Sequence, residues 1–500
     1  MKAITRINKE KSMNISQHIQ MMICLGFLTV GLMFWSTLVH AADRNITDDD
    51  INRAVEGQLI VDTVLPYDQL DVSTYKGIVT LNGEVDNILI RERVQRVAAS
   101  IKGVRGIVNR IIVKKNTMSD TNIQKAVESA WLRDPVADSY ELSAKVNNGV
   151  VTVNGTVQSW AEQQISLNVA KGVKGVREIE DNITIKPGSA RPENEMKAEI
   201  SSRLQYDVLV DDLLIKVAVD GTKAVLSGKV GSLTEKNRAI LDAWITGITE
   251  VEAESLDVVW GARYEMLRDN TALYKNDIQI RSAVQDALLM DPRVYAFNPR
   301  LTIQNGVVYL NGVVDNFRAK KAAESDTRNI IGVKRVKNLL KVRPTDQTPD
   351  DVLKKWVKNA LEVNPVVDEA EVDVRVDGGK VYLYGEVDDR YEKYHAGRVV
   401  ETVDGVIRVE NFLTYPDRVV LKSDSELVGD IEDKLFWSAY VDSDQVHVTA
   451  SNGNVTLSGQ VSSSMEQGTA EDNAYEAGAK YVINKLTIMS DRFHHRKPEI

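Results

Sequence analysis

The feature that most constrains this chain is a short glycine-containing strand that occurs six times, as in GVVTVNGTV, which ends at Val157. Apolar residues alternate through every copy, which predicts a half-buried β-strand. A glycine inside such a strand indicates a bulge or the close approach of another backbone. Successive inner glycines are separated by 72, 73, 84, 73 and 74 residues, so one small fold is repeated six times. These inner glycines are Gly83, Gly155, Gly228, Gly312, Gly385 and Gly459.

Each repeat has the same predicted order of elements. A helix with apolar residues on one face comes first, and a short strand and the glycine strand then flank a polar turn such as Asn148-Gly149. Such turns favour antiparallel hairpins. A second helix and a third strand follow, so we expect an α+β fold of six α-β-β-α-β domains, each a three-stranded sheet with two helices on one face. A second glycine should cap the second helix. These glycines are Gly103, Gly175, Gly247, Gly332, Gly405 and Gly478.

The predicted domain organisation is a signal peptide, six tandem domains and one longer linker. The domains are numbered here as repeats 1 to 6. Because a domain of about 70 residues has only a marginal core, we expect separate small domains that lean on their neighbours. The predicted bounds are 1–41 for the signal peptide, 47–115, 119–187, 194–260, 277–343, 348–416 and 423–490 for the repeats, and 261–276 for the linker.

The N-terminus is typical of a targeting segment. Lys2 and Arg6 give it a positive start, an apolar run follows at 21–39, and Val39-His40-Ala41 fits a cleavage site. We expect cleavage and a periplasmic protein, although the apolar run is also long enough to stay as an inner-membrane anchor. Cys24 is the only cysteine, so the exported part has no thiol.

Net charge limits the partners. Residues 1–41 hold four of the 62 basic and one of the 72 acidic side chains, so the remainder carries 58 and 71, a net charge of −13. Nucleic acid is therefore excluded as the main partner, since phosphate binding needs a basic face.

A comparison of the repeats yields no catalytic group. The positions that we find shared by all six are apolar residues and the two glycines, which excludes a six-fold catalytic site. Histidines are few and scattered, so no metal and no cofactor are predicted. One asparagine nearly recurs after the second glycine, and we expect it to start or kink the third strand. It is Asn109, Asn182, Asn338, Asn411 and Asn484 in five repeats.

The unit order, the xVxLxGxV strand and the second glycine that follows it in each unit resemble the BON domain (bacterial OsmY and nodulation). The resemblance covers nearly all of the chain after the signal. It implies a small non-enzymatic domain of the bacterial cell envelope, in proteins that associate with phospholipids and respond to stress.

Two surface features are candidates for lipid contact. Basic residues on the second helices of repeats 1 and 4 could meet anionic headgroups, or could be ordinary solvated helix faces. Apolar tips of the first helices, Trp131-Leu132 and Leu288-Leu289-Met290, could insert at an interface, or could belong to the core. The candidate basic residues are Arg91, Arg93, Arg96, Arg318, Lys320 and Lys321.

The leading hypothesis is a non-catalytic, exported envelope protein that binds an anionic phospholipid membrane surface or envelope components through many weak contacts, in envelope maintenance or osmotic stress. The alternative is a scaffold that forms homo-oligomers or binds protein partners through sheet edges.

Overall fold

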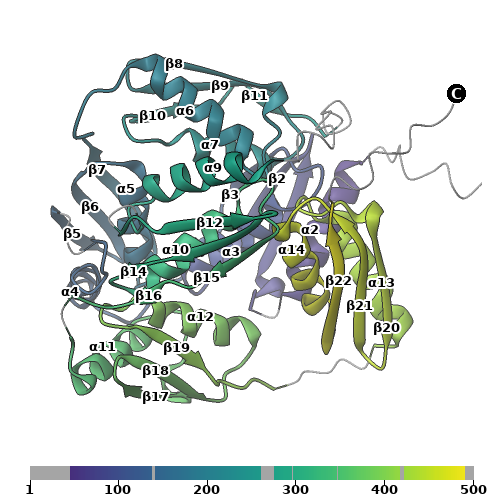
Figure 1. Cartoon of the computed structure of the whole chain (residues 1–500). Coiled ribbons are helices and arrows are strands. Elements are labelled where there is room, and N and C mark those ends of the chain that lie inside the picture. Colours follow the sequence, from purple (N-terminus) through teal and green to yellow (C-terminus); the bar gives the residue numbers. More distant parts are fainter. Residues whose placement is uncertain are drawn as a thin grey trace, which may run out of the picture. The chain divides into compact units, whose positions relative to one another are not determined.

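A computed structural model describes residues 46–489, except 63, 138–140, 261–274, 295, 296, 346 and 417–421 (Figure 1). The expected signal peptide, the apolar run 21–39, and the linker up to residue 274 therefore lie outside the described residues. The described residues from Asp48 onward belong to one compact unit.

Each repeat begins with a helix that is followed by an antiparallel hairpin, as predicted. In repeats 2 and 5, for example, Ala144 pairs with Val153 and Val374 with Leu383. The first helices are α2 (Asp48–Val61), α4 (Asp120–Trp131), α6 (Glu193–Tyr206), α9 (Asp277–Met290), α11 (Asp350–Glu362) and α13 (Asp424–Trp437). The first strands are β1 (Leu70–Tyr75), β5 (Glu141–Asn147), β8 (Ile215–Asp220), β12 (Arg300–Gln304), β17 (Val372–Asp377) and β20 (Val446–Ser451). The glycine strands are β2 (Ile78–Val85), β6 (Val150–Val157), β9 (Lys223–Val230), β13 (Val307–Asn311) with β14 (Val313–Val314), β18 (Lys380–Gly385) and β21 (Asn454–Val461).

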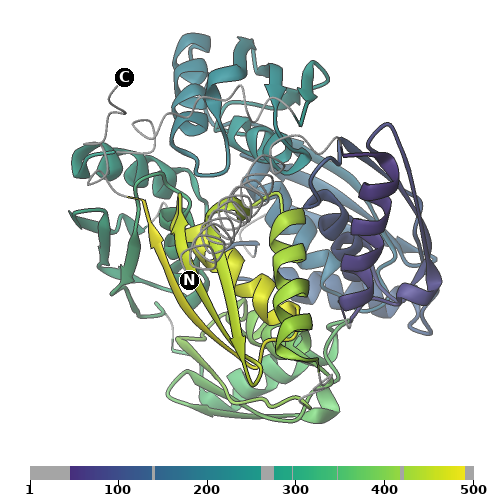
Figure 2. The same cartoon turned by 90° about the vertical axis from the view of Figure 1, so that its right-hand side faces the viewer.

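A second helix then crosses back and places the third strand parallel to the glycine strand, which in each repeat pairs with both the first and the third strand. Figure 2 shows this arrangement for repeat 6, drawn in yellow. The second helices are α3 (Ile88–Ala99), α5 (Trp160–Lys171), α7 (Leu233–Ala243), α10 (Phe317–Arg328), α12 (Arg390–Glu401) and α14 (Ser464–Glu476). The third strands are β3 (Gly106–Asn109) with β4 (Ile112–Val113), β7 (Glu178–Ile185), β10 (Glu250–Glu252) with β11 (Leu256–Val258), β15 (Arg335–Asn338) with β16 (Lys341–Val342), β19 (Arg408–Asn411) and β22 (Tyr481–Ile488). The α+β fold of six tandem α-β-β-α-β domains is confirmed.

The nearly recurrent asparagine has a structural role in repeats 1, 4, 5 and 6, whereas in repeat 2 Asp181, and not Asn182, accepts the backbone N–H two residues further on. Asn338 ends β15, where its Oδ1 accepts the Leu340 N–H at 3.2 Å and its Nδ2 donates to the Lys320 carbonyl of α10 at 2.7 Å. Asn411 makes the equivalent pair of bonds in repeat 5. In these two repeats the side chain therefore lies where the strand ends and ties it to the second helix.

Close approach of another backbone requires glycine at the inner position, which is one of the two possibilities that the sequence raised. A Cβ on Gly155 would lie 2.4 Å from the Glu141 carbonyl oxygen, and on Gly385 1.9 Å from that of Glu371, both on the chain entering the first strand. All six have a positive φ, between 121° and 158°. The neighbouring backbone belongs to the hairpin and not to the second helix. Gly312 differs, since its nearest neighbours are 3.7 Å away or more.

The second glycine is displaced from the position expected for it. Helix α3 ends at Ala99 with Ser100 as its C-cap, so Gly103 lies in the turn that leads to the third strand. Only in repeat 6 does the glycine, Gly478, follow the C-cap residue Ala477 directly. All six nevertheless have φ between 83° and 111°, a conformation that favours glycine.

The repeats pack against one another, because their second helices make contacts in a cyclic order within each half of the chain. Lys171 of repeat 2 pairs with Glu92 of repeat 1 at 2.7 Å, and Thr234 of repeat 3 donates to the Ala99 carbonyl of repeat 1 at 3.0 Å. Trp160 and Trp244 stack between repeats 2 and 3 with ring centroids 5.4 Å apart. The second half repeats this order: Lys321 lies 4.0 Å from Glu401, Arg390 lies over the Tyr475 ring at 4.5 Å, and Ser464 donates to the Val333 carbonyl at 3.4 Å.

The backbone hydrogen bonds between the halves pair repeat 1 with 6, 2 with 5 and 3 with 4. In each pair, backbone hydrogen bonds connect the end of a first helix to the end of a second helix, and we call each such contact a joint. The donor and acceptor pairs are Lys102 to Trp437 and Ala439 to Ser100 in the 1–6 joint, Lys174 to Val363 and Asp404 to Arg133 in the 2–5 joint, and Val208 to Asn329 and Ile331 to Tyr206 in the 3–4 joint, at 2.6–3.1 Å.

Candidate functional site

An acidic residue begins the first helix of all six repeats, which corrects the conclusion that no acid recurs. Each lies at one fixed spacing before the inner glycine of its repeat, as Asp120 does before Gly155. The two oxygens of Asp120 accept the N–H groups of Asn148 and Gly149 at 2.8 and 2.9 Å, so the carboxylate clamps the hairpin turn. The six residues are Asp48, Asp120, Glu193, Asp277, Asp350 and Asp424.

This clamp is structural. Hydrogen bonds from Gly453 and Asn452 to Asp424 lower the pKa of that carboxyl, which keeps it an ionised acceptor. The carboxylate also lies at a helix N-terminus, where negative charge is favourable. The fixed spacing between acid and glycine would have been sufficient to find the clamp in the sequence.

A second polar position follows the first helix and is engaged in many repeats. The Oδ1 atoms of Asp134 and Asp207 accept the backbone N–H groups two residues further on, at 3.0 and 2.7 Å. Their Oδ2 atoms bind arginines, which are Arg318 of repeat 4 for Asp134 and Arg238 of the same repeat for Asp207. These side chains therefore bind the backbone after the first helix and place charged groups next to the joints.

The six basic residues predicted to bind lipid differ in how accessible they are. Arg93 donates to Asp62 at 2.6 Å and lies over the Tyr391 ring of repeat 5 at 4.1 Å, and Arg318 is ion-paired with the buried Asp134. Lys320 donates to the Leu340 carbonyl at 2.8 Å. Among the remaining residues Arg96 and Lys321 are exposed and Arg91 is half-buried. Arg93 and Arg318 are therefore committed to contacts between repeats, and Lys321, although exposed, lies 4.0 Å from Glu401 of repeat 5.

Exposed apolar side chains recur at one place, in the last turn of the first helix or just after it. Ile60, Leu132 and Leu289 lie at the same spacing before the inner glycines of repeats 1, 2 and 4, and they are 52%, 73% and 47% exposed. The equivalent residues in repeats 3 and 5 are Gln205 and Glu362. Trp131 and Leu288, by contrast, are core residues, 4% and 3% exposed.

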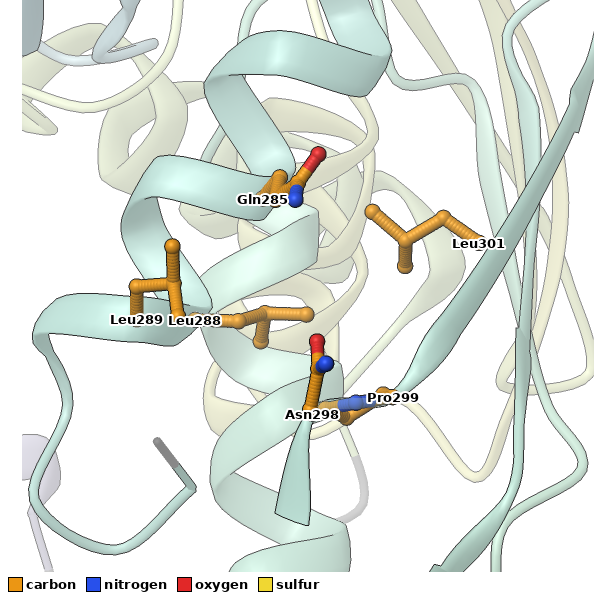
Figure 3. Close-up of a pocket in the computed structure, with 6 residues that line it drawn as sticks. All are labelled: Gln285, Leu288, Leu289, Asn298, Pro299 and Leu301. Atoms are coloured by element: carbon orange, nitrogen blue, oxygen red, sulfur yellow. The ribbon is translucent and has the colours of Figure 1, made fainter. Parts of the chain in front are cut away.

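Titratable groups and cavities in the described part of the chain give little support for a catalytic or metal site. His395 is buried, stacks on Tyr391, and has its pKa lowered to about 4 by burial and by nearby arginines. Within the described ranges, no three His, Cys, Asp or Glu side chains are grouped to hold a metal ion. A hollow in repeat 4, between α9 and the start of β12, is lined by residues such as Gln285, Leu289 and Asn298 and accommodates little more than a water molecule (Figure 3).

No helix in the described ranges combines the length and the apolar character needed to span a bilayer. The run 21–39 lies outside these ranges.

Comparison with known proteins agrees with this repeated α-β-β-α-β unit, a small domain whose shared polar residues stabilise its own turns. The family described as "BON domain" matches residues 47–115, 119–187, 192–258, 276–344, 349–417 and 423–490. The chain belongs to the BON domain family.

Two curated relatives share part of the chain. Osmotically-inducible protein Y of Escherichia coli K12 is 32% identical over 130 residues, which are 25% of this chain and 65% of that protein. The chain thus covers slightly less than two thirds of that relative. The outer membrane lipoprotein DolP of Haemophilus influenzae is 30% identical over 141 residues, 27% of this chain and 73% of that protein. A solved C-terminal domain of CdsD, a structural protein of the type III secretion system of Chlamydia trachomatis, is 12% identical and aligns over 43% of this chain and 100% of its own, with a TM-score of 0.12, which is too low to support an inference.

Proposed function

We propose that this chain is a non-catalytic protein of the bacterial cell envelope that holds an anionic phospholipid surface through several weak contacts. The observation that carries the proposal is the recurrence of exposed apolar residues at one position in three repeats, Ile60, Leu132 and Leu289. Single exposed apolar residues are common, but recurrence at one place in a repeated fold favours a shared use. The names of the two relatives, one osmotically inducible and one an outer membrane lipoprotein, are consistent with an envelope location.

Weak sites on one chain add up. Once one repeat is bound, the others reach the surface at a high effective concentration, so overall affinity exceeds that of each site. Exposed basic residues such as Arg96 and Lys321 would add about 1 kcal/mol each near an anionic surface.

Co-sedimentation of the protein with phosphatidylglycerol-containing vesicles at low salt tests the proposal. We expect binding that weakens about tenfold or more when Ile60, Leu132 and Leu289 are all changed to Gln, the residue that repeat 3 carries at this place. Leu339→Gln is the matched control, because Leu339 is 54% exposed but lies elsewhere in its repeat. No sedimentation of the unmodified protein, or equal loss with the control, would overturn the lipid proposal.

A scaffold that binds protein partners is the second candidate. Tyr384 and Phe412 stack at 5.4 Å on the sheet of repeat 5 and are 36% and 52% exposed, which suits a protein contact. Light scattering after size exclusion checks this candidate: we expect a defined oligomer that Tyr384→Ser with Phe412→Ser converts to a monomer. A monomer before and after the substitutions would contradict self-assembly.

A further inference from the structure

The 3–4 joint contains two buried acids at equivalent positions. Asp242 on α7 and Asp326 on α10 follow the inner glycines of their repeats, Gly228 and Gly312, at the same spacing. Their side chains are 10% and 19% exposed. The Oδ2 atom of each is buried and has no hydrogen-bond partner among the described residues. An ionised carboxylate in such a place is costly, so the protonated form is favoured.

Charged groups from both repeats face these two acids. Asp207, which follows α6, pairs with Arg238 of α7 at 2.6 Å, and Arg238 lies 3.9 Å from Asp242. In repeat 4, Asp291 accepts from Arg293 Nε at 2.9 Å, and Arg293 lies 3.9 Å from Asp326. Arg203 of α6 acts on both buried acids. Asp134 of repeat 2 also acts on Arg293.

The charges do not balance when every carboxyl is ionised. Among the described residues, four carboxyls, those of Asp207, Asp242, Asp291 and Asp326, then face the three guanidinium groups of Arg203, Arg238 and Arg293. In addition, the negative charge of Asp291 disfavours a second negative charge on Asp326. Burial first, and the charge of Asp207 second, raise the pKa of Asp242 to about 7. Burial and the charge of Asp291 raise the pKa of Asp326 well above its ordinary value.

The other two joints show that the fold does not need acids there. The equivalent residues are Val169 and Val399 in the 2–5 joint, and Val97 and Asn473 in the 1–6 joint. None of these side chains titrates. The pair of acids is therefore a property of the 3–4 joint alone, which is also the joint between the two repeats that the long linker connects.

We propose that the 3–4 joint is a proton-operated contact between the two halves of the chain, closed while Asp242 and Asp326 carry protons and weakened when they lose them. The direction follows from the two carboxyls, which bind a proton more tightly in the closed joint than when exposed to water. The joint is at full strength below the ordinary pKa of an aspartic acid, 3.8, and loses strength as the pH rises from there to about 7.

Backbone amide exchange in the full chain tests the proposal, because every joint has its own reporter amides. Val208 and Ile331 donate the hydrogen bonds of the 3–4 joint, while Lys174 and Asp404 donate those of the 2–5 joint. We expect protection of Val208 and Ile331, corrected for the intrinsic rate, to fall about tenfold or more between pH 5 and pH 8. Protection of Lys174 and Asp404 should stay constant.

The double variant Asp242→Val with Asp326→Val, which copies the 2–5 joint, should remove the pH dependence and keep the joint closed at pH 8. The double variant with Asn at both positions, which cannot ionise, should do the same and serves if the valine variant fails to fold. Equal pH dependence of protection in the 3–4 and 2–5 joints, or a fall at the 3–4 joint that persists in both double variants, would overturn the proposal.

Discussion

Two glycines of repeat 6 make opposite predictions for the same substitution. Gly459 lies in β21 with a φ of 121°, and a Cβ there would lie 2.0 Å from the Gln445 carbonyl oxygen. Gly468 lies inside helix α14, where nothing approaches its Cβ position within 4 Å. Gly459→Ala should therefore destabilise repeat 6, whereas Gly468→Ala should stabilise it.

The magnitudes follow from the local geometry. A non-glycine residue held at such a φ costs on the order of 1–3 kcal/mol, and the contact is with backbone, which cannot rotate away. Relief by moving the strand apart would lose hairpin hydrogen bonds worth about 1 kcal/mol each. We therefore expect Gly459→Ala to cost about 3–4 kcal/mol and Gly468→Ala to gain about 0.5–1 kcal/mol, since alanine loses less backbone entropy in a helix.

Hydrogen exchange of the β20–β21 hairpin amides, together with chemical unfolding, measures both changes. Protection of the hairpin should fall in the first variant and stay equal or rise in the second. If Gly459→Ala cost less than about 1 kcal/mol, or if both variants shifted stability in the same direction, the account of the inner glycine as a position closed by the hairpin backbone would be refuted.

Three other predictions concern a hydrogen-bonded carboxylate, an ion pair and a buried histidine. Asp350→Ala removes the acceptor for two turn N–H groups and should cost about 2 kcal/mol in urea unfolding, whereas Asp351→Ala, at the exposed neighbour, should change stability by less than about 0.5 kcal/mol. Arg318→Met leaves the buried Asp134 without its arginine and should cost about 3 kcal/mol, of which a second change, Asp134→Asn, should recover part in a double-mutant cycle. His395 has a folded-state pKa of about 4, so its contribution should be complete above about pH 6.5 and decrease by up to about 3 kcal/mol toward pH 4; unfolding at pH 7 and pH 4.5 should show a smaller difference in His395→Leu than in the unmodified protein.

The fold of a single repeat was predictable because its determinants are local and recur six times. Three features depend only on residues of the same repeat: the glycine strand, the Asn-Gly type of turn and the apolar face of the first helix. The clamp by Asp120 and its counterparts belongs to the same class, because each acid lies at a fixed spacing before the inner glycine of its own repeat. The displaced second glycine has a similar cause, since the turn after the helix needs the same positive φ as a helix cap.

Contacts between repeats were not predictable in the same way. Repeat 1 contacts repeat 6 through the backbone of Lys102 and Trp437, and a backbone hydrogen bond requires no particular side chain. The basic residues Arg93 and Arg318 looked like surface charges in the sequence, because their partners Tyr391 and Asp134 lie in distant repeats. Burial of this kind depends on long-range packing, which residue spacing within one repeat does not reveal.

The order of the joints has a consequence for how the chain is completed. Along the sequence, the 3–4 joint closes the shortest loop, the 2–5 joint encloses it, and the 1–6 joint, from Lys102 to Trp437, encloses both. The joints are thus nested along the sequence. During synthesis, which starts at the N-terminus, the 3–4 joint can form first and the 1–6 joint last. Repeat 1 is synthesised first, but its partner in the joint, repeat 6, is synthesised last. In a chain that stops before repeat 6, the surface of repeat 1 that forms the 1–6 joint remains uncovered. This exposed surface distinguishes an incomplete chain from a complete one.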